Sequence, residues 1–390
     1  MKIGVVAMQY REGTMGGTET YLQNLFAVGG TFAAPDEMVL FGSMHNEDDL
    51  KAIKGPLTMQ TIYPTFGQSA RRVCIRGVRL LQRRFFHGQL EDVVDFADVD
   101  LLHFPFCAIL PKMKKRNGKI IVTIHDLQHL EYPEFFSRRE LDYREREYGF
   151  AVRHADLILT DSVYSCNAIR SYYGLDANRV QVYQPGIDIE YFCRNDNIIP
   201  ERLLREKGID KPYLMYPAAT WPHKNHGRLL RAMEQLVSER SFDGLLVLTG
   251  ISREAVQKIR RLTDQLKISH AVLVLGYVHR TEMKTILSHA RILIFPSLFE
   301  GYGFPLLEAM AAGIPIACSR VASLPELGGD AVEYLDPSKS ESIAEAVWRL
   351  WNDEHRQNEL RLLGRRRVSR WNLQECSRAL RSVYNNMMDS

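Results

Sequence analysis

The chain has 390 residues, of which 45% are hydrophobic and 25% charged, the proportions of a globular protein. These values exclude a largely disordered chain, a collagen and a coiled-coil rod. With 50 Lys and Arg against 47 Asp and Glu, the formal net charge is only +3, which argues against a nucleic-acid partner. At about 100–200 residues per domain, the length predicts two to three domains.

The cysteines and the N-terminus indicate the compartment. None of the 6 cysteines forms a C-x-x-C pair, and scattered single thiols are typical of a reducing environment. The apolar stretch Ile3–Met8 is too short for the core of a signal peptide. No apolar run approaches the roughly 20 residues of a membrane span. We therefore expect a cytoplasmic protein.

Short apolar runs alternate with segments of helical period along the first half of the chain. Such runs are typical of buried parallel strands, because helices cover both faces of a parallel sheet. The strands expected here are Lys2–Met8, Met38–Phe41, Leu101–Phe104, Ile120–Ile124, Leu157–Leu159 and Val180–Val182. A glycine-bearing loop follows the first strand and leads into a helix expected over 19–28.

The same alternation starts again near Tyr213. Five apolar runs read PYLMYPA, GLLVLTG, AVLVLG, RILIFPS and IPIACS. The helices expected between them cover about 225–238, 252–267, 281–288 and 304–312. Alternation on this scale predicts βαβ units with right-handed crossovers. The expected fold class is therefore α/β, with two doubly wound halves.

No strand-like run occurs over 186–211, and we place the joint between the halves there. The first domain is expected to cover 1–190 and the second 191–390, with a C-terminal helix at about 371–390 that packs back onto the first. Ligands of open α/β sheets bind beyond the carboxyl ends of the strands, and clefts between domains are common binding sites. Polar residues just after each strand are therefore the candidates for function.

The residues that follow RILIFPS form the clearest functional pattern. Glu300, Gly301 and Gly303 lie in a loop, and Pro305 opens a helix. A helix N-terminus favours an anion such as phosphate, and the carboxylates of Glu300 and Glu308 accept hydrogen bonds from sugar hydroxyls. The pattern predicts a nucleotide sugar rather than a bare phosphate. The alternative is a solvated loop acid and an ordinary acid in the first turns of a helix.

This stretch, FEGYGFPLLEAMAAGIPI, resembles the retaining glycosyltransferases of family 4. Their fold is GT-B, in which two Rossmann-like domains face a central cleft. The resemblance extends to GGTE at 16–19, HDLQHLEYPEFF at 125–136, DSVYS at 161–165, QPGID at 184–188, PAATWPHKNHGRLLRA at 217–232 and VASLPELGGDAVEYLDP at 321–337. It implies the same fold and a nucleotide diphosphate sugar as the donor substrate.

The resemblance also implies roles for two of these acids. Glu300 would contact hydroxyls of the donor sugar as a catalytic residue, and Glu308 would bind the ribose of the nucleotide. The backbone that would hold the pyrophosphate belongs to Gly301, Tyr302, Gly303 and Phe304.

Lys224 is the expected counter-charge for the diphosphate. It lies between an expected strand and an expected helix, where a cation neutralises a departing diphosphate. Family members often carry an arginine a few residues earlier, which is absent here, so His223, His226 or Arg228 would substitute for it. Asn225 is expected to cap the helix. The family needs no metal at the phosphates and the chain has no D-x-D pair after a strand, so we expect neither metal nor cofactor.

A histidine and an aspartate follow the strand Ile120–Ile124. The resemblance implies that His125 contacts the donor sugar near its anomeric centre and helps to orient the acceptor. Asp126 either orients His125 or caps the following segment. His103 also follows a strand and is expected in the core or the cleft wall.

Two glycines, Gly16 and Gly17, stand in the loop after the first strand. Either they let the backbone approach the donor phosphate or the acceptor, or they only form a tight turn. The loop does not match the G-x-G-x-x-G pattern, which argues against a dinucleotide-dependent oxidoreductase. Glu19 either caps the following helix or faces the cleft.

The segment RRVCIRGVRLLQRRFF at 71–86 concentrates positive charge. On a helix, its spacing puts cations on one face and apolar residues on another, as in helices that lie on anionic membranes. The cations of this face are Arg72, Arg76, Arg79 and Arg83. The alternative is a solvated face of a helix packed on its own domain. Many family members act on lipid-linked acceptors at the inner membrane face, which makes peripheral membrane contact relevant.

The function expected from these patterns is transfer of a sugar to a hydroxyl of a lipid-linked or saccharide acceptor, with retention of configuration. The HDLQHLEYPEFF and SLPELGGDA segments resemble bacterial mannosyltransferases of surface polysaccharide assembly, which favours GDP-mannose as donor. A UDP- or dTDP-sugar is the alternative within this fold. A non-catalytic binding module is the alternative of another class, supported only by the absent arginine before Lys224.

Overall fold

The computed structural model describes residues 1–11, 15–27, 37–43, 46–51, 53, 58–62, 99–111, 118–193 and 200–389. The basic stretch at 71–84, with Arg72, Arg76, Arg79 and Arg83, lies outside these ranges. Its contact with a membrane therefore stays a prediction. Among the described residues, no helix has the length and apolar character that crossing a membrane requires.

The first half of the chain forms a seven-stranded parallel sheet in the order β3-β2-β1-β4-β5-β6-β7. Its strands are β1 Lys2–Val6, β2 Glu37–Ser43, β3 Thr58–Ile62, β4 Leu101–Phe104, β5 Lys119–Thr123, β6 Leu157–Thr160 and β7 Val180–Val182. The sequence predicted all of these except β3, whose residues TMQTI include three polar side chains and do not form an apolar run.

The second half forms a six-stranded parallel sheet in the order β10-β9-β8-β11-β12-β13. Its strands are β8 Tyr213–Pro217, β9 Leu245–Thr249, β10 Val272–Gly276, β11 Ile292–Phe295, β12 Ile316–Ser319 and β13 Glu333–Leu335. The five predicted apolar runs are β8 to β12. Both sheets reverse their strand order beside the first strand, β1 or β8, so the predicted pair of doubly wound α/β units is confirmed.

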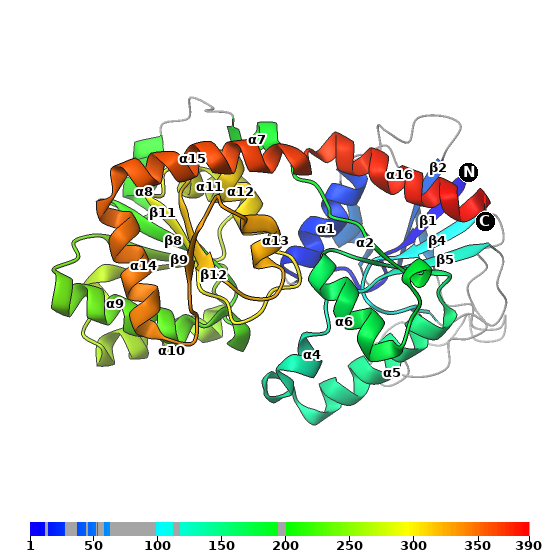
Figure 1. Ribbon diagram of the computed structural model, residues 1–390, viewed down its shortest axis with the longest axis horizontal. Helices are drawn as coiled ribbons and strands as arrows, with labels where there is room; N and C mark the ends of the chain where they lie inside the picture. Colours follow the sequence, from blue (N-terminus) through cyan, green and yellow to red (C-terminus); the bar gives the residue numbers. More distant parts are fainter. Residues whose placement is uncertain are drawn as a thin grey trace, which may run out of the picture.

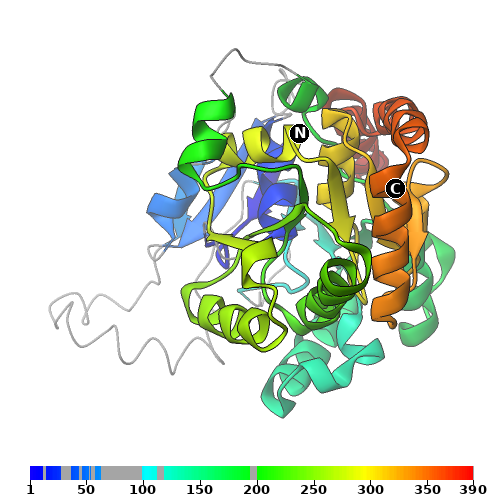
Figure 2. The same ribbon diagram turned by 90° about the vertical axis from the view of Figure 1, so that its left-hand side faces the viewer.

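Helices cover both sheets, and the two units lie side by side (Figure 1). In the view from the end of the second unit, helices pack on both faces of its sheet (Figure 2). The helices are α1 Gly17–Ala27, α2 Glu47–Lys51, α4 Gln128–Glu131, α5 Arg138–His154, α6 Val163–Tyr173, α7 Ile189–Cys193, α8 Pro200–Glu206, α9 His226–Arg240, α10 Arg253–Gln265, α11 Arg280–Ser288, α12 Phe304–Ala312, α13 Leu324–Gly328, α14 Ser340–Asn352, α15 Glu354–Val368 and α16 Leu373–Asp389.

The last helix, α16, crosses from the second unit onto the first (Figure 1). Tyr384 on α16 is fully buried, and its hydroxyl lies 2.7 Å from Nδ1 of His103 on β4. Where the chain leaves the second unit, Ile187 and Asn372 form a parallel bridge, and Ile187 N–H donates to the Trp371 carbonyl. The chain therefore crosses between the units twice, near Ile187 and near Asn372, and the two crossing segments lie side by side.

The two units also touch across the gap between them. Glu326 on α13 of the second unit accepts hydrogen bonds from the backbone N–H groups of Val163 and Tyr164, at 2.8 and 2.6 Å. These groups are in the first turn of α6, which has no intrahelical acceptors for them and whose positive dipole end favours a carboxylate. The contact holds the carboxyl ends of the two sheets close together.

Candidate functional site

Lys224 and Glu300 meet at the carboxyl ends of β8 and β11. Lys224 ends the short helical turn Pro222–Lys224 after β8, and Glu300 lies in the loop after β11. Lys224 Nζ donates to Glu300 Oε1 at 2.6 Å, and both side chains are largely buried. Because charges removed from water need close partners, each of these two side chains stabilises the other at the carboxyl ends of the strands.

The loop that carries Glu300 is held by a serine that the sequence analysis did not single out. The hydroxyl of Ser323, which is fully buried, contacts the carbonyls of Glu300 and Tyr302, both at 2.8 Å. The Tyr302 hydroxyl donates to the Pro185 carbonyl at 2.8 Å, which ties the loop to the segment joining the units. In the sequence, the only signal for Ser323 was its position in the SLPELGGDA motif.

The N-terminus of α12 opens onto this loop. Gly303 precedes the helix with φ of 136°, a conformation that favours glycine, and it has no side chain to cap the first turn. The helix covers Phe304–Ala312, the predicted range, but Phe304 rather than Pro305 is its first residue. Without a side-chain cap, the positive end of α12 is available to an anion.

Glu308 lies one turn further along α12 and is partly buried. Within the described residues its carboxylate forms no hydrogen bond or ion pair. Burial raises its pKa to about 7, and the charge of Arg280 only partly opposes this shift. A buried acid without a protein partner is suited to accept hydrogen bonds from a ligand.

The glycine loops bring the two units together at the site. A Cβ atom added to Gly301 would lie 2.9 Å from Asp126 Oδ2 and 3.0 Å from the His125 carbonyl oxygen, closer than side chains pack. A Cβ atom on Gly17 would lie 3.6 Å from the Phe304 ring. The predicted HD, GG and EGYG motifs therefore lie against one another.

His125 is buried at the end of β5 beside an aspartate whose role was not predicted. His125 Nδ1 lies 2.6 Å from Asp161 Oδ2, and Nε2 lies 2.9 Å from the Pro105 carbonyl. Burial lowers the pKa of His125, but the charge and hydrogen bond of Asp161 outweigh it and keep the pKa above its usual value. Burial raises the pKa of Asp161 in turn. Asp161 was detectable only as the first residue of DSVYS, directly after β6.

The alternatives left open around this histidine are resolved. Asp126 Oδ1 accepts the N–H of Gln128 at 2.9 Å, so Asp126 caps the following segment, while Asp161 orients His125. His103 is fully buried between Thr123 and Tyr384 and belongs to the core. Burial lowers its pKa to about 3, so it is neutral at neutral pH.

Two of the proposed substitutes for the absent arginine carry no charge at neutral pH. Burial and the charge of Lys224 lower the pKa of His223 to about 3 and that of His226 to about 4. Arg228 donates to Asn225 Oδ1 at 3.1 Å. The prediction that Asn225 caps α9 with its side chain was wrong, because its amide instead binds the carbonyls of Pro296 and Pro337 at 2.9 and 2.8 Å.

Known protein families match most of this architecture. Residues 39–191 match the model of Glycosyltransferase Family 4, and residues 201–367 match that of Glycosyl transferases group 1. The chain therefore joins a family 4 domain to a group 1 domain, and both are domains of glycosyltransferases. As a glycosyltransferase, it has its GG, HD and DSVYS motifs on the first unit and its Lys224, Glu300 and Glu308 on the second.

Related glycosyltransferases include several named mannosyltransferases. The O-antigen chain mannosyltransferase B of Escherichia coli is 27% identical over 280 residues, which cover 72% of this chain and 71% of that protein. The O-antigen chain mannosyltransferase RfbU of Salmonella typhimurium is 25% identical, over 58% of this chain and 59% of its own.

Solved structures share the fold over the full chain. HepE of Anabaena, in complex with UDP and glucose, superposes with a TM-score of 0.72 at 17% identity and covers 99% of each chain. Sucrose-phosphate synthase of Thermosynechococcus elongatus gives a TM-score of 0.75 at 16% identity, over 100% of this chain and 99% of its own. The fold of this glycosyltransferase is GT-B. Among the described residues, no group of three or more His, Cys, Asp or Glu side chains could hold a metal ion.

Proposed function

We propose that this glycosyltransferase transfers mannose from GDP-mannose to a hydroxyl of a lipid-linked or saccharide acceptor in cell-surface polysaccharide synthesis. Two relatives are named as O-antigen chain mannosyltransferases, and a third, from Mycolicibacterium hassiacum, as an MMP α-(1→4)-mannosyltransferase at 27% identity. The observation that carries a glycosyl-transfer site is the Lys224–Glu300 pair beside the uncapped N-terminus of α12.

The second unit would bind the donor through its charges. The diphosphate takes the N-terminus of α12 and the ammonium group of Lys224, because both stabilise anionic oxygens. The ribose hydroxyls donate to Glu308, which has no partner among the described residues. Glu300, once Lys224 turns to the phosphates, accepts hydrogen bonds from the sugar. Lys224 Nζ and Glu300 Oε1 lie 2.6 Å apart, so one ligand can reach both side chains.

The proposed chemistry retains the configuration of the sugar. The bond between the anomeric carbon and the diphosphate oxygen breaks, and the acceptor oxygen bonds to that carbon on the same face. The acceptor proton passes to the departing diphosphate oxygen, so no enzyme nucleophile is required. Lys224 and the dipole of α12 lower the energy of this step because charge develops on the leaving group. The site uses no metal in this scheme.

The first unit would orient the sugar and the acceptor. The ring of His125 is held by Asp161 and the Pro105 carbonyl. The backbone carbonyl of His125 lies beside Gly301, next to Asp126. The acceptor side of the cleft is then formed by the loops after β1 and β5. Contact of Arg72, Arg76, Arg79 and Arg83 with anionic lipids would place this unit at the inner face of the membrane. Their replacement by glutamate would then reduce co-sedimentation with anionic vesicles, and unchanged binding would contradict it.

A screen of nucleotide sugars tests the proposed donor. The purified protein is incubated with GDP-mannose, UDP-glucose and dTDP-rhamnose separately, and hydrolysis and transfer are followed by mass spectrometry. We expect turnover of GDP-mannose alone, and its loss in Glu300→Ala. Turnover of only a UDP- or dTDP-sugar would replace the donor while keeping the reaction. Binding of every donor without turnover would favour a non-catalytic module instead.

A further inference from the structure

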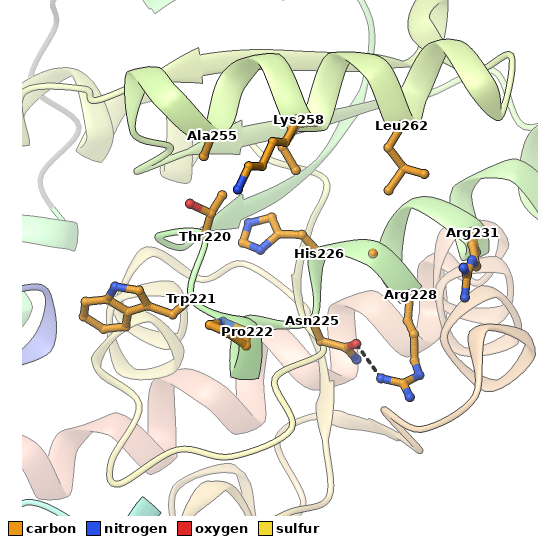
Figure 3. Close-up of a pocket in the computed structure, with 12 residues that line it drawn as sticks. Thr220, Trp221, Pro222, Asn225, His226, Arg228, Arg231, Ala255, Lys258 and Leu262 are labelled. Carbon is orange, nitrogen blue, oxygen red and sulfur yellow. Dashed lines mark hydrogen bonds between the residues drawn. The ribbon is translucent and has the colours of Figure 1, made fainter. Parts of the chain in front are cut away.

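A cavity lies in the second unit, separate from the Lys224–Glu300 pair. It has a volume of 490 Å³ and is bounded by the loop after β8, the first turns of α9 and one face of α10 (Figure 3). Neither Lys224, Glu300 nor Glu308 lines it. The cavity and the proposed donor site therefore share the loop at 220–225 but no charged side chain.

The charge around this cavity is positive. Arg228, Arg231 and Lys258 line it, and none of the described residues in its wall is acidic. Within the described part of the chain, Arg231 and Lys258 form no ion pair. Lys258 extends from α10 toward Thr220 and the ring of His226 (Figure 3). Unpaired cations without nearby acids favour an anionic ligand.

The N-terminus of α9 opens onto the same cavity. Its first-turn N–H groups, on His226, Gly227 and Arg228, have no acceptor among the described residues, and the Asn225 side chain does not cap them. A Cβ atom added to Gly227 would meet no atom within 4 Å, so there is open space beside this residue in the first turn. A helix of 15 residues thus presents its uncapped positive end to empty space.

His226 provides an independent indication of a ligand. Its side chain lines the cavity, only 7% of the residue is exposed, and Nε2 has no hydrogen-bond partner. The ring hydrogen-bonds the Ala218 backbone and is neutral at neutral pH, because burial and the charge of Lys224 lower its pKa to about 4. A neutral ring that donates through one nitrogen accepts through the other, so Nε2 lacks a donor. Buried polar atoms in proteins are rarely left without a hydrogen-bond partner.

We propose that this cavity binds a small phosphomonoester that carries hydroxyl groups. Its phosphate lies at the N-terminus of α9 and accepts hydrogen bonds from Lys258, while a hydroxyl of the same ligand donates to His226 Nε2. The volume exceeds what a phosphate ion needs and leaves room for the organic part. The cavity does not include Lys224, Glu300 or Glu308, so this ligand is distinct from the proposed donor.

Isothermal titration calorimetry with glycerol 3-phosphate tests the site. We expect the wild-type protein to bind it and Lys258→Gln to bind about tenfold more weakly, the effect of one charge-assisted hydrogen bond. Arg260→Gln, on the same helix but outside the cavity, serves as the matched control with unchanged affinity. No heat of binding to wild-type protein at millimolar concentrations, or equal affinities for Lys258→Gln and wild type, would overturn the proposal.

A second variant separates lost binding from lost folding. Gly227→Asp puts a carboxylate into the open space at the start of α9, which favours the helix but repels phosphate. We expect an unchanged or higher Tm and no detectable binding. Lys224→Gln should bind glycerol 3-phosphate normally, and the reverse pattern would place the ligand in the donor site. Methyl phosphate should bind more weakly than glycerol 3-phosphate, and equal affinity would contradict the contact with His226.

Discussion

The carboxyl ends of the two sheets use polar residues in different ways. Beyond the end of the second sheet, Lys224 and Glu300 lie in loops after two different strands and pair with each other, while Glu308 on α12 has no partner among the described residues. At the end of the first sheet, polar groups are bound within the unit, as His125 is by Asp161 and the Pro105 carbonyl. The same architecture therefore carries exchangeable partners on one side and fixed partners on the other.

This difference indicates which residues are available to a ligand. The Lys224–Glu300 pair can exchange partners when an anion contacts Lys224, because the buried cation is then not left without a partner. A buried histidine whose two ring nitrogens are bound exchanges its partners only if the local structure moves. We therefore expect substitutions in the second sheet to act on the chemistry directly, and those in the first sheet to act through position.

The largest effect should come from breaking the exchangeable pair. Glu300→Gln keeps the size of the side chain but removes the charge that holds Lys224 and the proposed sugar. We expect the rate of sugar transfer to fall about 10²–10³-fold, and Tm to fall as well because Lys224 becomes a largely buried cation without its partner. The measurement is product formation followed by mass spectrometry, with the exposed Glu239→Gln as a matched control. Near-normal turnover would refute the role of Glu300.

The next effect should come from loosening the fixed partners of the first sheet. Asp161→Asn removes the carboxylate that orients His125 and should lower the pKa of that histidine. We expect kcat to fall by up to about 100-fold while KM for the donor changes less, because the donor binds mainly to the other unit.

The pKa of His125, measured by nuclear magnetic resonance titration, distinguishes the two roles of Asp161. It should change in Asp161→Asn if Asp161 orients the ring, and a purely structural role would leave it unchanged. Asp176→Asn, at an exposed position of the same unit, is its control. An unchanged His125 pKa in Asp161→Asn would show that another group orients the ring.

A smaller effect should come from the serine behind the donor loop. Ser323→Ala removes the hydroxyl that contacts the carbonyls of Glu300 and Tyr302 and leaves both without that partner. We expect the free energy of unfolding to fall by about 1–3 kcal/mol. Chemical denaturation measures this change, and Ser238→Ala on the exposed side of α9 is the control. Equal stabilities of the two variants would mean that the loop does not depend on Ser323.

The smallest effect should appear as a pH dependence of the second unit. Since burial raises the pKa of Glu308 from 4.5 to about 7, the folded protein binds a proton in this range that the unfolded chain does not bind. Stability should therefore fall as pH rises from about 4.5 to about 7 and then level off. Glu308→Gln lacks this dependence, so its Tm should decline less over that range. Parallel profiles of Tm against pH would contradict the shift.

The sequence predicted the parts of the fold that depend on apolar runs. The strands that became β8 to β12 and the helix Phe304–Ala312 appeared where the pattern placed them. The sequence did not predict β3 or β13. In β3, TMQTI, polar residues interrupt the apolar ones, and β13 has only three residues, EYL. Both are edge strands, which helices cover less completely than central strands, so fewer of their side chains need to be apolar.

The candidate site was predictable where one motif carries one role, and less so where partners come from distant segments. Lys224 and Glu300 were predicted separately, but their ion pair joins residues 76 positions apart. Asp161 stands 36 positions from His125, and only the pairing of β5 with β6 brings them together. Asn225 resembled a helix cap, and its binding of two remote carbonyls could be known only from the folded chain.

The paired crossing at Ile187 and Asn372 limits how the units can separate. The two chain segments are bonded to each other there, and a Cβ atom on Gly186 would lie 2.9 Å from the Leu373 Cα, so they have no room to slide. We therefore expect these two segments, at one edge of the molecule, to move together. If the units separate for substrate exchange, the expected motion is a rotation about this edge that moves the carboxyl ends of the two sheets apart.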